Sequence, residues 1–87
     1  MQSPIVLPEL GADNVRLSVW FVDPGDLVYE GDRVVEVLCN GASFDVASSV
    51  TGRFVERKAQ PDDPLVSGQV LGMIEVEEAR QTRKDPP

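Results

Sequence analysis

The chain has 87 residues, of which 41% are hydrophobic, and a formal net charge of −7 at pH 7. A chain of this length forms one small domain with a thin core, and its hydrophobic content is too high for a disordered chain. The acidic balance argues against nucleic acid and anionic membranes as partners. No apolar run approaches the length of a membrane span, and a single cysteine forms no internal disulfide, so the sequence fits a reducing cytoplasm.

The N-terminal part of the chain predicts an edge strand or a strap, followed by one regular strand. Residues 1–3 are expected to be a loose end, and the run from Pro4 to Pro8 is bracketed by prolines, which cannot donate to a central ladder. Residues 15–22 alternate apolar and polar side chains, which is typical of a strand with one buried face. Trp20 falls on the polar side of this pattern, and we expect it to be a partly buried packing residue.

An internal repeat with a spacing of 37 residues runs from Pro24 onward and again from Pro61 onward. Each copy reads Asp-x-apolar-x-x-Gly-x-x-apolar-x-x-apolar, and a proline-containing turn opens each copy. Because each half alone buries only one side of a small sheet, the two halves must pack together to form one core. The apolar positions of the repeat are the predicted core: Val28, Val34, Val37, Leu65, Leu71 and Ile74.

Asn40-Gly41 stands between two apolar arms near the middle of the chain. Asn-Gly is the strongest short-range hairpin signal, because a type I′ turn requires positive φ at both central residues. The arms, 34–39 and 42–46, are predicted to be strands. In the first arm the core positions Val34 and Val37 are three apart and not two, which predicts either a β-bulge or a strand buried on both sides.

The remaining segments complete an all-β prediction. Residues 70–76 are expected to close the sheet, whereas residues 77–87 carry mixed charges without an apolar stripe. No segment repeats apolar residues at helical spacing over about ten positions, so many short strands separated by turns are expected. We therefore predict one domain over 4–76 and a flexible charged tail over 77–87.

Five segments, in this order, carry a resemblance to a known family: Val6–Gly11, Trp20–Asp32, Val34–Val37, Val50–Gly52 and Asp63–Leu71. Together they resemble the lipoyl domain of the acyltransferase subunits of 2-oxo acid dehydrogenase complexes, with biotin carrier domains as more distant relatives. The resemblance covers residues 4–76. It implies a flattened barrel, or barrel-sandwich hybrid, of two four-stranded antiparallel sheets related by a pseudo-twofold axis.

In that family the hairpin tip carries Asp-Lys-Ala, and the lysine is lipoylated. An ungapped alignment through the hairpin puts Asn40, Gly41 and Ala42 at the Asp, lysine and Ala places. Gly41 has no amine to acylate, and neither Lys58 nor Lys84 matches the motif. The resemblance therefore implies the fold without the cofactor, and no lipoate is expected. The candidate partner-binding residues are those of the tip: Leu38, Cys39, Asn40, Gly41, Ala42 and Ser43.

The residue types present limit other chemistry. The chain has no histidine, which excludes Cys-His and Ser-His pairs and histidine-containing metal sites. Cys39 has no base or cation beside it in the sequence, and we expect a small, partly buried residue there and not a reactive thiol. Asp62 and Asp63 lack the spacing of a calcium loop and are expected to be solvated turn residues. No metal site is expected.

The function favoured by the sequence is that of a lipoyl-like domain without a prosthetic group, which serves as a binding or assembly module for a protein partner. We expect a cytoplasmic monomer that is not an enzyme. The alternative is a lipoyl or biotinyl carrier domain with a divergent attachment site, in which case lipoate would be bound. A catalytic role is the weakest hypothesis, because no nucleophile–base pair can be built from these residues.

Overall fold

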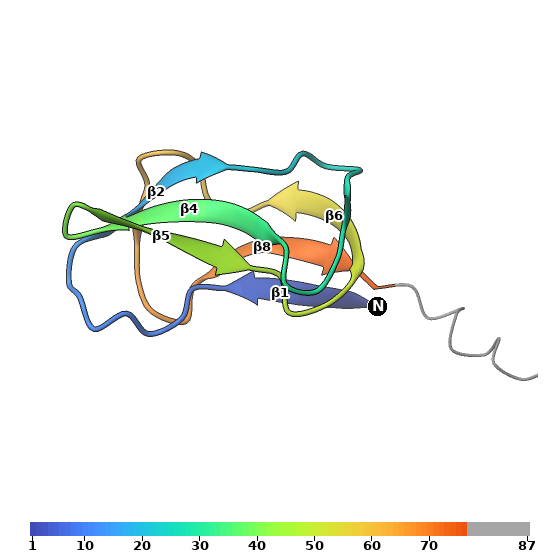
Figure 1. Cartoon of the computed structure of the whole chain (residues 1–87), viewed down its shortest axis with the longest axis horizontal. Helices are drawn as coiled ribbons and strands as arrows, with labels where there is room; N and C mark the ends of the chain where they lie inside the picture. The colour runs from blue at the N-terminus through green and yellow to red at the C-terminus, as the bar shows by residue number, and fades with distance from the viewer. Residues whose placement is uncertain (77–87) are drawn as a thin grey trace, which may run out of the picture.

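A computed structural model describes residues 1–76, which form eight β-strands and no helix (Figure 1). The strands make two four-stranded antiparallel sheets with the orders β1-β8-β6-β3 and β5-β4-β2-β7. Their bounds are β1 Gln2–Val6, β2 Val15–Trp20, β3 Leu27–Val28, β4 Arg33–Cys39, β5 Ala42–Ala47, β6 Gly52–Arg57, β7 Pro64–Leu65 and β8 Val70–Glu75. The predicted all-β class with two four-stranded sheets is confirmed, and the predicted tail, 77–87, lies outside the described residues.

The internal repeat relates the two sheets to each other. A shift of 37 residues carries β2, β3 and β4 onto β6, β7 and β8, and the pairings of one sheet recur in the other. The turn before β3 is closed by Asp26, whose Oδ2 accepts a hydrogen bond from Asp23 N at 2.9 Å. Asp63 Oδ2 accepts one from Gln60 N at the same distance in the second half. The repeat therefore reproduces the hydrogen bonds of the turn as well as the apolar spacing.

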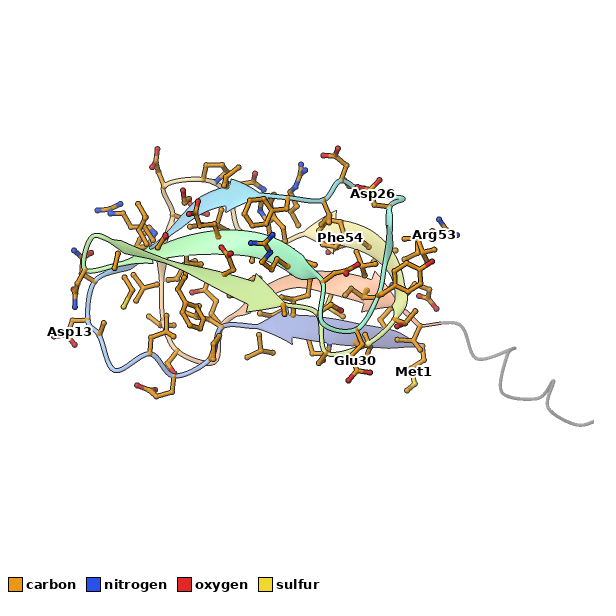
Figure 2. The ribbon with its side chains drawn as sticks, viewed as in Figure 1. Met1, Asp13, Asp26, Glu30, Arg53 and Phe54 are labelled. Atoms are coloured by element: carbon orange, nitrogen blue, oxygen red, sulfur yellow. The ribbon has the colours of Figure 1, made fainter. Side chains whose placement is uncertain are left out.

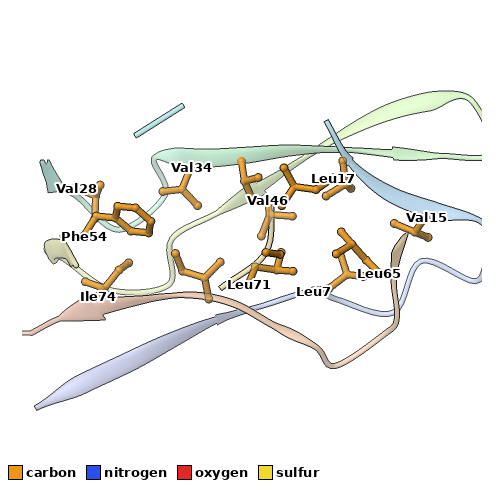
Figure 3. Close-up of a cluster of buried hydrophobic side chains, with 14 residues drawn as sticks. Leu7, Val15, Leu17, Val28, Val34, Val46, Phe54, Leu65, Leu71 and Ile74 are labelled. Atoms are coloured by element: carbon orange, nitrogen blue, oxygen red, sulfur yellow. The ribbon is translucent and has the colours of Figure 1, made fainter. Parts of the chain in front are cut away.

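The core lies between the two sheets (Figure 3). All six residues predicted from the repeat are buried, with exposed fractions of 4% or less. Phe54 is the largest fully buried side chain, and its ring centroid lies 5.2 Å from that of Trp20. The Trp20 indole Nε1 donates a hydrogen bond to Ala59 O at 3.0 Å. Trp20 is half-buried and packs against the core, as expected.

A bulge changes the face that β2 turns toward the core. The register of β2 against β4 shifts between Leu17 and Val19. Leu17 is buried, whereas Val19 and Phe21 are 42% and 48% exposed. The predicted alternation over 15–22 is therefore wrong beyond Leu17, because one extra residue in a strand moves all following side chains to the opposite face.

Two other segments test the expectations for the chain ends and for β4. The register of β4 against β5 shifts between Arg33 and Val35, which confirms the irregularity predicted from the spacing in this strand. The loose end expected at residues 1–3 is wrong, because Gln2 and Ser3 pair with β8. Since β1 lies at the edge of its sheet, the strand accommodates Pro4, as expected.

Candidate functional site at the hairpin tip

The β4–β5 hairpin ends in a two-residue turn. The strands pair as far as Cys39 and Ala42, which leaves Asn40 and Gly41 as the loop. Their φ values of 53° and 88° are those of a type I′ turn, so the predicted turn is confirmed. In Figure 1 this turn lies at one end of the molecule and the N-terminus lies toward the other. The tip is thus presented on a fully paired hairpin, away from the point where the chain begins.

A backbone hydrogen bond fixes the tip to the neighbouring loop. Asn40 N donates to Asn14 O at 3.0 Å, which links the turn to the segment between β1 and β2. Sequence reasoning missed Asn14, because the contact uses its carbonyl and no side-chain pattern signals it. Two anchors, the strand ladder and this bond, therefore limit the orientations that the tip can take.

The structure brings the six predicted tip residues together at the end of the β4–β5 hairpin. Leu38 is 37% exposed, and Cys39 is half-buried against the core as a free thiol. The other four are exposed: Asn40, Gly41, Ala42 and Ser43. Cys39 is thus the small, partly buried residue that was expected, and the tip offers solvent one apolar side chain among small and polar ones.

The tip residues do not fit a covalently attached carrier group. An amide bond to lipoate or biotin requires a primary amine, and none of the six side chains supplies one. Space is not the obstacle, because a Cβ added at Gly41 would meet no atom within 4 Å. Among residues 1–76 the only lysine is Lys58, which follows β6 in the other sheet and whose Nζ lies 2.8 Å from Glu56 Oε2.

The electrostatic environment of the described domain is acidic. Residues 77–87 contain three acidic and three basic residues, so the whole net charge of −7 belongs to residues 1–76.

Glu9, in the loop between β1 and β2, has a pKa below its usual value because Ser67 Oγ donates to its carboxylate at 2.6 Å and Gly11 N donates at 3.2 Å. Both bonds favour the ionised carboxylate.

The described residues offer little else for chemistry. They contain no group of three or more His, Cys, Asp or Glu side chains placed to hold a metal ion. The same part of the chain has no helix long and apolar enough to cross a membrane. Asp62 and Asp63 are exposed turn residues, as expected, and the carboxylate of Asp63 accepts the hydrogen bond from Gln60 N.

The chain matches the biotin/lipoyl family model, described as biotin-requiring enzyme, over residues 3–74. It is 33% identical over 75 residues to the lipoamide acyltransferase component of the branched-chain alpha-keto acid dehydrogenase complex of Pseudomonas putida. It is 32% identical over 77 residues to the component of the same name in Bacillus subtilis. These matches cover 84% and 86% of this chain but 18% of each relative, so the chain spans about a fifth of their length.

The fold gives an independent comparison. The structure matches the lipoyl domain of the 2-oxoglutarate dehydrogenase complex from Azotobacter vinelandii with a TM-score of 0.62 and 22% sequence identity. This match covers 88% of this chain and 96% of that domain. Lipoyl domains are carrier domains and not catalytic ones, in line with the expectation that this chain is not an enzyme. The resemblance carried by the quoted segments is thus confirmed, and the chain belongs to the biotin/lipoyl family, in which it is a lipoyl-type domain.

Proposed function

We propose that this lipoyl-type domain carries no prosthetic group and serves as a protein-binding or assembly module of an acyltransferase-type complex. The observation that supports the proposal is the tip itself. Asn40 and Gly41 form the turn at which the family presents its lysine, and they offer no amine although the hairpin stays fully paired up to the turn. The relatives are named as components of multienzyme dehydrogenase complexes, so a protein partner fits this domain.

The tip suits contact with a protein because it is preorganised and exposed. The ladder of β4 with β5 and the hydrogen bond from Asn40 hold it in one conformation, so binding costs little ordering entropy. Leu38 pairs across the strands with Arg16 on one side and with Ser43 on the other. The proposed contact surface therefore combines one apolar side chain with a cation and a hydroxyl. We also propose that the protein is a cytoplasmic monomer.

The first test is the intact mass of the protein purified from its native cell. The proposal predicts the mass of the unmodified polypeptide, with no lipoyl or biotinyl adduct. An adduct mapped to Lys58 or Lys84 would establish the alternative, a carrier with a divergent attachment site, and would overturn the proposal.

The second test measures binding of the 2-oxo acid dehydrogenase complex purified from the same cell. Leu38→Ser should weaken binding to that complex by about tenfold, because it removes the apolar side chain of the tip. Val6→Ser is the matched control, since Val6 is 41% exposed but lies on β1 in the other sheet. Equal affinities of the two variants would show that the tip is not the contact surface.

A further inference from the structure

A groove of about 610 Å³ lies between the turn before β3 and the start of β4. Phe21, Val22, Leu27 and Val28 form its apolar part, and of these Phe21 and Leu27 are 48% and 50% exposed. Figure 2 shows Asp26, which also lines the groove, toward the end of the molecule opposite to Asp13, which lies beside the hairpin. Large apolar side chains gathered around one groove, and not scattered singly, mark an interaction site.

The internal repeat shows that the fold does not require these apolar side chains. In the second half Lys58 stands at the place of Phe21, and Pro64 stands at the place of Leu27. The second half nevertheless closes the same turn through Asp63 and forms the same short strand pairing, β7 with β2. The exposed pair in the first half is therefore not explained by folding.

The charged side chains that line the groove indicate what it binds. Asp26 and Asp32 line it, and each carboxylate accepts a hydrogen bond from a backbone N–H three residues earlier, at 2.9 and 2.8 Å. The basic lining residue, Arg33, has its Nη1 3.2 Å from Asp45 Oδ2, so its charge is offset within the domain. The groove thus combines an apolar floor with two carboxylates, which complement a cationic segment that carries a large apolar side chain.

A second copy of this chain is a poorer occupant. Each copy carries its whole net charge of −7 on residues 1–76, so two copies joined at this groove would bring like charges together. A basic segment of another protein gains from the same field.

We propose that the groove docks a basic segment of a partner protein. A large apolar side chain of that segment lies between Phe21 and Leu27, and Lys or Arg side chains flank it and face Asp26 and Asp32. This surface is separate from the hairpin tip, and the proposal does not depend on whether the tip carries a prosthetic group.

The test selects peptides from a random phage-displayed library on the purified chain, and removes those that also bind the double variant Phe21→Lys/Leu27→Ser. Lysine is chosen because the second repeat already carries it at the equivalent place. The recovered peptides are synthesised, and their affinities are measured by fluorescence anisotropy. Circular dichroism checks that the variants fold, and Phe21→Lys alone replaces the double variant if that variant does not fold.

The proposal predicts peptides in which Lys or Arg flanks a large apolar residue. Their affinity should fall by about tenfold or more in the double variant, and several-fold on raising the salt concentration or in Asp32→Asn. Phe44→Ser, which removes a side chain of similar exposure at 42%, should leave the affinity unchanged. Acidic or uncharged peptides, or no enriched peptide at all, would overturn the proposal. Self-association of the wild type that the double variant loses would overturn it too, in favour of a contact between copies.

Discussion

Replacing Gly41 by lysine places an amine at the tip, and the structure allows the loss of stability to be worked out. Gly41 has a φ of 88°, in the left-handed region that costs a side-chain-bearing residue about 1 kcal/mol. Apart from Gly41 itself and its two neighbours in the chain, no residue has a heavy atom within 4 Å of the Cβ that the substitution adds, so no steric clash adds to this cost. The turn is exposed, so no packing is lost. We expect Gly41→Lys to fold with a loss of about 1 kcal/mol, or about 4–8 °C in Tm for a domain of this size.

The assay treats the wild type and the variants with a lipoate ligase and follows the intact mass. The wild type should gain no adduct, and Gly41→Lys should gain one at least in part. Complete modification is not expected, because Asn40 stands where the resemblance places the acid of the family motif and the flanking Leu38 and Cys39 are apolar. Gly41→Ala is the control for backbone strain, and Ser43→Lys is the control for an exposed lysine outside the turn.

Three outcomes would contradict this account of the tip. If Gly41→Lys lost several kcal/mol more than Gly41→Ala, the space around the tip would not be open. An adduct on Lys58 or Lys84 of the wild type would show that the domain is a carrier. If the ligase ignored a folded Gly41→Lys variant, the flanking residues would have left the carrier role together with the lysine.

Three further variants test the packing and the loop beside the tip. Phe54→Ala should lower the free energy of unfolding, measured by urea denaturation, by about 3–5 kcal/mol because Phe54 is fully buried. Phe44→Ala should lower it far less because Phe44 is 42% exposed. Equal losses of stability would contradict the burial of Phe54 in the core. Gly52→Ala should lower the free energy of unfolding by about 1–3 kcal/mol, because the added Cβ would meet a backbone oxygen of β8. An unchanged midpoint of urea denaturation would show that β6 and β8 can move apart at little cost. Ser67→Ala should raise the pKa of Glu9, followed by NMR titration, because the hydroxyl donates to the ionised carboxylate. Because its pKa is lowered in the folded state, the Glu9 carboxylate stabilises the fold at pH values above its unfolded-state pKa, and this stabilisation is lost as the pH falls through the folded-state pKa. Ser67→Ala should therefore weaken the dependence of stability on acidic pH. An unchanged Glu9 titration would rule out this hydrogen bond in solution.

The fold could be predicted largely from the internal repeat. Spacing placed the core correctly at positions such as Val28 and Leu65, because a glycine turn and a short strand fix the side that an apolar residue faces. Asn-Gly also fixed the type of the hairpin turn, since few residue pairs accept positive φ at both positions. These features are local in sequence, and local chemistry decides them.

What the sequence did not disclose depends on pairing between distant segments. The bulge at Leu17–Val19 is a property of the ladder of β2 with β4, and it exposes Phe21, which strict alternation had placed inside. Asn14 contacts the tip through its carbonyl, which every residue has. The groove beside Leu27 likewise arises only when the turn before β3 lies against the start of β4.

A difference between the two halves of the repeat indicates function only if packing within the domain does not explain it. Trp20 and Arg57 occupy equivalent places, yet they belong to one internal contact, with the guanidinium carbon 5.9 Å from the ring centroid. Trp20 Nε1 donates to Ala59 O at 3.0 Å, and Arg57 Nη2 donates to Val22 O at 2.9 Å, so two different side chains make equivalent hydrogen bonds in the two halves of the repeat. A difference of this kind serves packing. By contrast, Phe21 is 48% exposed where the other half has Lys58, and its place in the lining of the groove supports the proposed docking of a partner segment.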